Sequence, residues 1–310
     1  MTNRTKQIRM ASLIAIIGNA FLAAVKLVIG LISGSLAVVA DGIDSTGDVM
    51  VSLITLYTSF LIARPPDIKY PYGYGKAEPI ATKALSFVLF FAGTQLIISS
   101  VRKFINGVTD EMPSLIALYA IGISIVGKIL LALYQYRIGK KTNSRMLVAN
   151  GLNMQTDVML SVSVFVGLIL THLLNMPVID KILAALLGIW IIKVAYGIFM
   201  ETNFELMDRS ADKELYEKVF RIIDKIKGVK NPHRVRIRKI GNNIMIAVDL
   251  EMDGSLTLYR AHQLSHEVEQ KLKEEIQDVF DVAIHIEPFG DNIEEKSFGI
   301  SKENLEQLGY

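Results

Sequence analysis

The sequence contains no cysteine among its 310 residues. This absence excludes disulfides, thiolate metal sites and cysteine nucleophiles, and it leaves the redox state of the compartment unmarked. Neither sign of charge is in excess, because 33 basic and 31 acidic residues give a formal net charge of +2. No nucleic-acid partner is therefore expected. The phosphate-binding pattern G-x-x-x-x-G-K-[ST] is also absent, so ATP hydrolysis is not expected.

Apolar side chains, by contrast, are abundant. Hydrophobic residues make up 51% of the chain, and the mean hydropathy is +0.37. The excess lies before about residue 200, which predicts a membrane domain over 1–206 and an aqueous domain over 207–290. Residues 291–310 are polar and are expected to form a mobile tail. The first apolar run is too long for a signal peptide and lacks a small-residue cleavage site, so it is expected to remain a helix.

Six apolar runs are each long enough to cross a bilayer as a helix. They extend from about Met10 to Ile32, Leu36 to Ala63, Pro79 to Val101, Leu115 to Tyr136, Leu147 to Leu170 and Val178 to Phe199. Lys and Arg gather at the amino terminus, in the loops after the second and fourth spans, and after the sixth span. Because basic residues favour the cytoplasmic side, this distribution predicts an integral, multi-pass protein in a lipid bilayer with both termini in the cytoplasm. Arg102 and Lys103 do not fit the distribution, since they lie at the outer end of the third span.

The pattern after the sixth span is typical of a small soluble module. Two amphipathic helices alternate with three segments in which every second residue is apolar, in the order αββαβ. The elements are expected at 211–227, 235–240, 244–252, 256–275 and 279–287. Ser255 is the predicted N-cap of the second helix. The fold class is therefore an all-α membrane domain of six helices followed by a ferredoxin-like α+β domain.

Carboxylates interrupt two of the apolar spans. Asp41, Asp44 and Asp48 are three and four residues apart, so on a helix they share one face. Asn153 and Asp157 repeat the four-residue spacing in the fifth span. Carboxylates within a membrane are costly and persist mainly where they line a polar pathway or meet a positive charge. Two facing helices would therefore form a cation site, although capping or pairing within the bundle is the plainer alternative.

Three further charged residues in the spans have two readings each. Asp41 lies nearer the outer end of its helix, where it is either a second-shell or entrance residue of the metal site or an ordinary interfacial acid. Lys26 and Lys128 are either counter-charges for the carboxylates or lysines that extend to the membrane surface. The sequence does not decide between these readings.

These residues resemble the cation diffusion facilitator family. The resemblance rests on Asp44-x-x-x-Asp48 in the second of six spans, the pair ending in Asp157 in the fifth, the loop from Tyr70 to Glu78 and the ferredoxin-like carboxyl domain, and it covers about residues 10–290. It implies a homodimeric exporter of divalent transition-metal ions driven by proton exchange, a secondary transporter and not an enzyme. The implied transmembrane metal site consists of Asp44, Asp48, Asn153 and Asp157.

The resemblance implies contacts outside the membrane as well. In the cytoplasmic domain, the positions matching a metal site between protomers are His233, Asp249, His262, His285 and Glu287. The alternative is that these are surface residues of a soluble domain, and His266, one turn after His262, is a chance neighbour. The resemblance also pairs Lys76 with Asp208 as a charge link between the two domains. In the loop after the second span, Tyr70 and Tyr74 stand where some members have His, so only Asp67 remains of that loop site.

The identity of the metal depends on Asn153, because zinc-type members have His at that position. An amide oxygen with three carboxylates is an all-oxygen site that suits manganese, although zinc binds most sites more tightly. Manganese is therefore expected slightly ahead of zinc, with iron and cobalt behind. Two other classes of function stay open: a passive channel that uses the same carboxylates as a filter, and a membrane-anchored metal sensor.

Overall fold

The computed structural model describes residues 3–62, 64, 66–105, 112–142, 144–209, 213–240, 243–290 and 298–308. The chain forms two compact units. The helical unit comprises Met1–Tyr57 and Ala81–Glu201, and the sheet unit comprises Thr58–Ile80 and Thr202–Tyr310. The loop after the second span, expected within the membrane domain, thus groups with the sheet unit.

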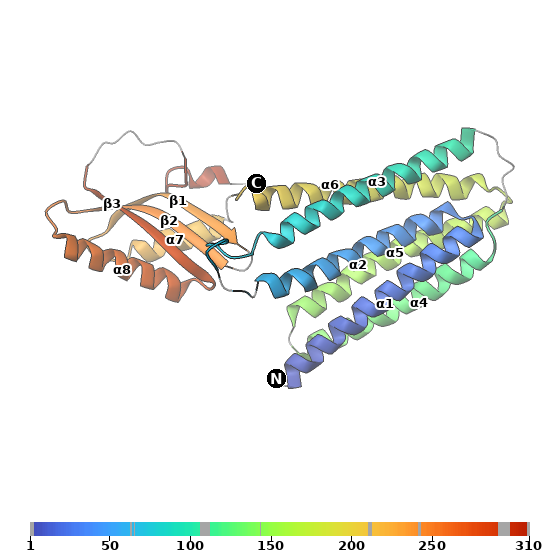
Figure 1. Cartoon of the computed structure of the whole chain (residues 1–310), viewed down its shortest axis with the longest axis horizontal. Helices are drawn as coiled ribbons and strands as arrows, with labels where there is room; N and C mark the ends of the chain where they lie inside the picture. The colour runs from blue at the N-terminus through green and yellow to red at the C-terminus, as the bar shows by residue number, and fades with distance from the viewer. Residues whose placement is uncertain are drawn as a thin grey trace. The chain divides into compact units, whose positions relative to one another are not determined.

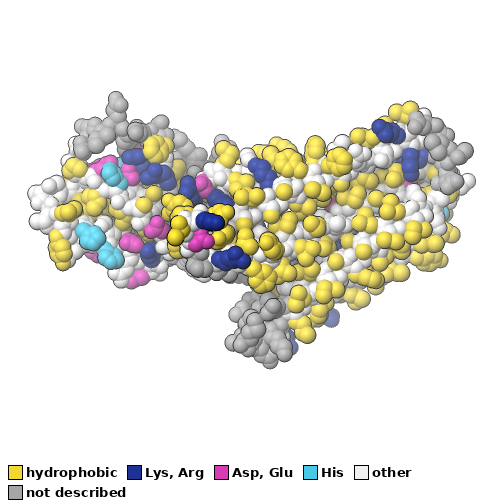
Figure 2. Space-filling model, viewed as in Figure 1, with side chains coloured by type: hydrophobic (Ala, Val, Ile, Leu, Met, Phe, Trp, Pro, Cys, Tyr) yellow, Lys and Arg dark blue, Asp and Glu magenta, His cyan; other side chains and the backbone are white. Residues whose placement is uncertain are grey.

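Six long helices account for the predicted spans (Figure 1). Their bounds are α1 Asn3–Ser33, α2 Leu36–Ile62, α3 Ala77–Ile105, α4 Ile116–Thr142, α5 Arg145–Leu173 and α6 Val178–Leu206. Each contains a segment long and apolar enough to cross a membrane, as predicted. In hydrocarbon a single segment must satisfy its own backbone hydrogen bonds, which requires helices. Figure 2 shows hydrophobic side chains spread over these helices, as expected of a surface that faces lipid.

Glycines allow two of these helices to approach closely. A Cβ atom placed on Gly93 of α3 would lie 2.9 Å from the carbonyl oxygen of Gly188 on α6, and one placed on Gly188 would lie 3.0 Å from the Gly93 carbonyl. A Cβ contact under 3.0 Å is essentially never seen in proteins, and one at 3.0 Å is unusually close. Membrane helices associate through small residues of this kind, because lipid provides no hydrophobic force to press them together.

The sheet unit contains the expected order of helices and strands. Its elements are α7 Lys213–Ile223, β1 Lys230–Ile240, β2 Asn243–Met252, α8 Leu258–Glu275, β3 Val279–Pro288 and the short 3-10 helix η1 Leu305–Leu308. β1 pairs antiparallel with β2, and β2 pairs parallel with β3, so the sheet order is β1-β2-β3. Both helices bury apolar side chains in one core with the strands, including Val219 and Phe220 of α7 and Val268 of α8. The α+β prediction is confirmed.

The predicted start of α8 is wrong. The N-cap of α8 is Thr257, whose hydroxyl accepts the Arg260 amide at 3.3 Å. Ser255 instead donates its amide and hydroxyl to the carboxylate of Asp253, at 2.8 Å and 2.7 Å. A short turn closed by this aspartate therefore delays the helix by two residues relative to the expected start.

The polar tail is also partly ordered against the sheet. Ile300 exchanges two backbone hydrogen bonds of 2.9 Å with Val235, and it packs on the core of the sheet unit. The expectation of a mobile tail therefore fails for 298–308, because Ile300 and Leu305 supply apolar contacts that a polar average conceals. Residues 291–297 lie outside the described part of the chain.

Candidate metal-binding sites

The carboxylates of the membrane spans converge. Asp44 and Asp48 of α2 and Asp157 of α5 each present an oxygen atom, and these oxygens lie within 4.8 Å of one another. Such a separation fits several ligands around one cation. Asn153 lies on α5 one turn before Asp157, and its amide stays the predicted fourth ligand.

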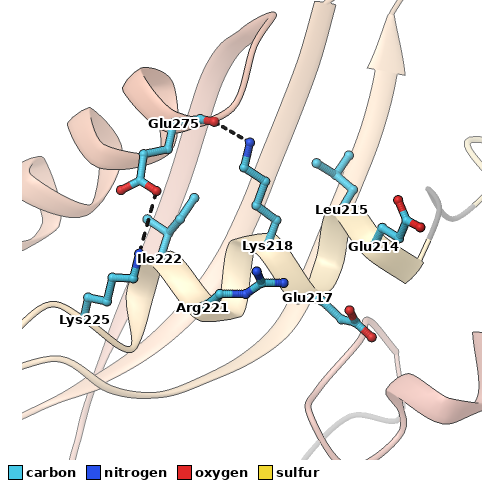
Figure 3. Close-up of a pocket in the computed structure, with 8 residues that line it drawn as sticks. All are labelled: Glu214, Leu215, Glu217, Lys218, Arg221, Ile222, Lys225 and Glu275. Carbon is cyan, nitrogen blue, oxygen red and sulfur yellow. Dashed lines mark hydrogen bonds and ion pairs between the residues drawn. The ribbon is translucent and has the colours of Figure 1, made fainter.

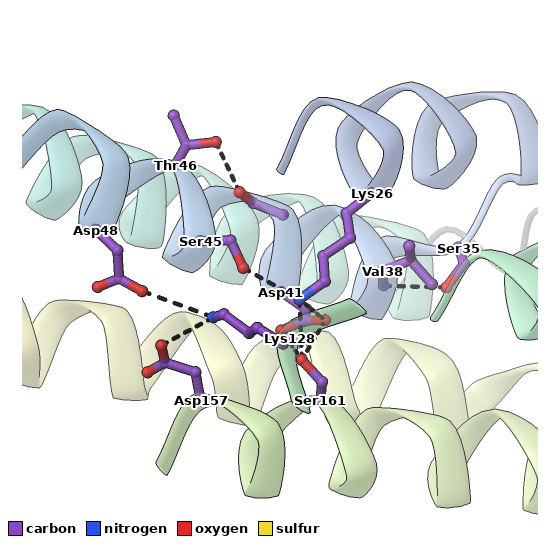
Figure 4. Close-up of polar contacts among 11 residues, drawn as sticks. Lys26, Ser35, Val38, Asp41, Ser45, Thr46, Asp48, Lys128, Asp157 and Ser161 are labelled. Carbon is purple, nitrogen blue, oxygen red and sulfur yellow. Dashed lines mark hydrogen bonds and ion pairs between the residues drawn. The ribbon is translucent and has the colours of Figure 1, made fainter. Parts of the chain in front are cut away.

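Lys128 of α4 is a counter-charge for this group. Its Nζ atom lies 2.9 Å from Oδ2 of Asp157 and 3.8 Å from Oδ2 of Asp48, and its side chain is buried (Figure 4). The ammonium group thus lies between the carboxylates of α2 and α5. A buried lysine placed in this way reduces the repulsion among like charges that are held together in a medium of low dielectric constant.

Asp41 and Lys26 form a second buried pair. Lys26 Nζ lies 2.7 Å from Asp41 Oδ2, and Ser161 of α5 donates to the same carboxylate at 3.0 Å. Both charged side chains are fully buried. Asp41 is therefore not an interfacial acid, and Lys26 does not extend to the membrane surface. Ser45 and Ser161, which also bind Lys26, were not singled out from the sequence because an isolated serine in an apolar span carries no pattern.

A second possible metal site lies across the three strands of the sheet unit. His233 of β1, Asp249 of β2 and Glu287 of β3 present ligand atoms within 4.8 Å of one another. His233 is directly opposite Asp249 in the antiparallel ladder. Its Nε2 lies 3.3 Å from Glu287 Oε2, and its Nδ1 lies 2.8 Å from the Asn231 carbonyl oxygen. An imidazole and two carboxylates form a donor set that fits a divalent transition metal.

The backbone around His233 is irregular in a way that orients it. Asn231 and Arg234 have φ values of 44° and 48°, and the pairing register of β1 shifts on either side of His233. Such bulges redirect a side chain at the edge of a sheet. Arg234 also contacts Asp249, with Nη1 2.6 Å from Oδ2, so a metal at this carboxylate would share it with a guanidinium group.

The remaining predicted histidines are arranged differently. His285 borders the cluster, with Nε2 3.5 Å from Glu287 Oε1, and its side chain is mostly exposed. His262 and His266 lie on α8 with exposed side chains and ring centroids 6.3 Å apart. Within the described part of this one chain, neither belongs to the group around His233.

The loop after α2 is held by its own aspartate. Asp67 accepts the Tyr74 hydroxyl at 2.7 Å and the amides of Lys69 and Tyr70 at 2.8 Å each. The Tyr74 hydrogen bond and the backbone hydrogen bonds hold the pKa of the Asp67 carboxyl below its ordinary value. The carboxylate that remains of the loop site thus stabilises the loop itself.

The residues of the predicted charge link are in contact. Lys76 Nζ lies 2.7 Å from Asp208 Oδ1 and donates to the Glu205 carbonyl oxygen at 2.6 Å. Arg238 of β1 binds the second oxygen of the same carboxylate at 2.8 Å. Asp208, at a φ of 53°, therefore joins the loop before α3 to the sheet within the sheet unit. Sequence reasoning did not identify Arg238.

A groove of about 670 Å³ follows α7 on the surface of the sheet unit (Figure 3). Its walls carry both signs of charge, and Lys218 donates to the Glu275 carbonyl oxygen. Lys225 Nζ lies 4.0 Å from Glu275 Oε2, and the charged side chains of the groove do not converge on one point as the carboxylates of the helical unit do.

Comparison with known proteins identifies the family to which the chain belongs. The family of cation efflux transmembrane domains matches residues 12–207, and the cation efflux protein cytoplasmic domain matches residues 211–289. Manganese efflux system protein MneP of Bacillus subtilis (strain 168) is 32% identical over 93% of this chain and 99% of its own length. Manganese efflux system protein MneS of the same organism is 29% identical over 89% of this chain and 94% of its own length.

Among solved structures, the metal-bound C-terminal domain of CzcD transporter from Thermotoga maritima is 35% identical over 26% of this chain and 93% of that chain, with a TM-score of 0.25. The family assignment rests on the sequence matches, of which the membrane one alone covers more than half of the chain. With its six apolar spans and its converging carboxylates, the protein belongs to the cation diffusion facilitator family and is an integral membrane cation transporter.

Proposed function

We propose that this protein exports a divalent transition-metal ion across the membrane in exchange for protons, with Asp44, Asp48, Asn153 and Asp157 as the transport site. The observation that carries the proposal is the convergence of three carboxylates from α2 and α5 within the spans. When ionised, they and the Lys128 ammonium leave two negative charges unbalanced, which one divalent cation neutralises. In the absence of metal, protons serve the same purpose, so metal entry displaces protons.

A passive channel and a metal sensor are the competing functions. A channel moves its ion only down the ion's own gradient, whereas an exchanger accumulates it against that gradient. Purified protein in vesicles with an imposed pH gradient should therefore concentrate manganese uphill, and the accumulation should stop when an ionophore removes the gradient. Flux that persists only down the metal gradient would support the channel, and no flux with any of manganese, zinc, iron and cobalt would support the sensor.

Manganese is proposed as the preferred metal, with zinc next. Support comes from the all-oxygen character of the site and from two relatives whose names describe manganese efflux. Asn153→His should raise the ratio of zinc to manganese transport about tenfold, which corresponds to ~1.4 kcal/mol for one nitrogen ligand. Asn175→His, in the loop after α5, is the matched control and should leave the ratio unchanged. An unchanged ratio in both variants would remove Asn153 from the selectivity site.

We infer that the protein acts as a homodimer whose sheet units bind metal between protomers, with both termini in the cytoplasm. A cytoplasmic-domain family that matches residues 211–289 supports this assembly. His233, Asp249 and Glu287 would supply ligands, and His285 and the exposed His262 are close enough to the surface to complete a shared site.

Metal at 100 times its dissociation constant should raise the free energy of unfolding by about 2.7 kcal/mol, since the metal binds the folded state. The melting temperature of the full-length protein should rise with added manganese or zinc, and His233→Asn should remove most of that rise. His266→Asn is the matched control on the exposed face of α8. An equal rise in both variants would place the stabilising metal elsewhere.

A further inference from the structure

A buried polar cluster lies beside the transport carboxylates in the helical unit. Lys26 of α1 lies 2.7 Å from Asp41 Oδ2, and its ammonium donates to Ser45 at 3.1 Å and to Ser161 at 2.9 Å (Figure 4). The ammonium group is therefore surrounded by one carboxylate and two hydroxyl oxygens, all from α2 and α5. This cluster of four residues is here called the Lys26 cluster.

Three members of the Lys26 cluster lie on the two helices that carry the transport site: Asp41, Ser45 and Ser161. Asp41 precedes Asp44 by three residues on α2, and Ser161 follows Asp157 by four on α5. Residues at these spacings lie on one helix face. The cluster is thus one turn from the transport site, on the side where α2 begins and α5 ends. This end of the helical unit, with the α1–α2 and α5–α6 connections, is here called the loop face.

The loop face is closed by a further layer of hydrogen bonds. The buried carboxylate of Asp180, at the start of α6, accepts the Ser35 hydroxyl and the Leu36 amide, and so caps α2. The Ser114 amide, before α4, donates to the Ser33 carbonyl oxygen at 2.9 Å. These contacts join the connections of the loop face to one another beyond the Lys26 cluster.

Exposure changes sharply between the transport site and the cluster. The side chain of Asp48 is 49% exposed and that of Asp157 is 24% exposed, whereas Asp41 is 2% exposed and Lys26 is fully buried. The carboxylates of the transport site are thus open to the surroundings, and the next polar layer toward the loop face is sealed.

We propose that the Lys26 ammonium is a tethered cation that closes the path from the transport site to the loop face, and that it withdraws from Asp41, Ser45 and Ser161 when the path opens. The proposal rests on the transport function proposed above. A divalent cation that leaves Asp44 toward the loop face meets a fixed positive charge within about one helical turn, in surroundings where like charges repel strongly. Withdrawal of Lys26 exposes a carboxylate and two hydroxyls, which are oxygen ligands suited to the same cation.

The alternative is that the cluster only fastens α1 to α2 and α5. A double variant separates the two roles, because replacing both charged residues leaves no unpaired buried charge. In Lys26→Ala with Asp41→Asn, the removed side chain leaves a polar space between an amide and two hydroxyls. A space of this kind fills with water. If the cluster is a gate, water and small reagents then reach it from the loop face.

The natural absence of cysteine makes the test direct. Ser161→Cys is introduced alone and together with the double variant, and metal-free membrane vesicles are treated from the loop face with a charged, membrane-impermeant thiol reagent. Ser100→Cys, buried near the carboxyl end of α3, is the matched control. Labelling of Cys at 161 should rise at least tenfold in the double variant, while Cys at 100 stays protected. A loosened fold would raise both.

Unchanged protection at position 161 in a folded double variant would overturn the proposal, and so would an equal rise at 161 and 100. The transport measurement is separate. The double variant should also let manganese run down its gradient without moving protons in exchange, whereas the parent chain should couple the two fluxes. If the parent chain moved no metal at all, the transport function would fail, while the labelling would still decide whether Lys26 closes the loop face.

Discussion

Asp157→Ala should reduce metal transport about 100-fold or to background in vesicles, with the protein still inserted in the membrane. Asp157 contributes the carboxylate of α5 that faces Asp44 and Asp48, and it is also the nearer partner of Lys128, at 2.9 Å. Its removal takes a ligand from the cation and leaves the Lys128 ammonium beside Asp48, 3.8 Å away, without its nearer partner. Both changes weaken cation binding, so the loss should exceed that of an ordinary ligand.

The matched control is Ser163→Ala, which lies on the same helix, six residues further along and with an exposed side chain. It should transport at the parent rate. Equal transport by Asp157→Ala and the parent chain, with both inserted to the same level, would remove this aspartate from the site. Asp44→Ala and Asp48→Ala should also reduce transport strongly, since the three carboxylates act on one cation.

Lys26→Met alone should destabilise the helical unit by ~3–5 kcal/mol, because it leaves Asp41 buried and without its cation. The effect should be large even though methionine has nearly the volume of lysine. The measurement is the thermal unfolding midpoint of the purified protein in detergent. Loss of the Lys26 ammonium also removes one of the two charged partners of the Ser161 hydroxyl. The Asp41 carboxylate then keeps the Ser161 hydroxyl as its hydrogen-bond donor.

Combining Lys26→Met with Asp41→Leu should recover most of that stability, because an apolar pair of similar volume replaces the ion pair without an uncompensated charge. Lys193→Met is the control for the substitution itself, since Lys193 lies exposed on α6. If the single and double variants melted at the same temperature, the Lys26 to Asp41 interaction would contribute nothing measurable, and the sealing of the loop face would have to come from the layer at Asp180.

Some features of this protein followed from the sequence alone. The six spans could be predicted because the thickness of the hydrocarbon fixes both length and composition. The shared face of Asp44 and Asp48 could be predicted because helical periodicity is local. The last strand followed from the alternation of Val282, Ile284 and Ile286 with polar residues, and the first from that of Val235 and Ile237. Each of these depends on neighbours within a few residues, so no knowledge of the tertiary structure was needed.

The partners of the buried charges were decided only by the tertiary structure. Lys26 and Lys128 had two readings each, and the choice depended on how α1 and α4 rotate against α2 and α5, which no single segment specifies. The same holds for His262, whose helical position indicated nothing about its distance from His233. Long-range contacts also overruled local pattern at Ile300, where pairing with Val235 orders a segment whose composition is polar. Buried charges find partners through packing, and packing is a property of the whole chain.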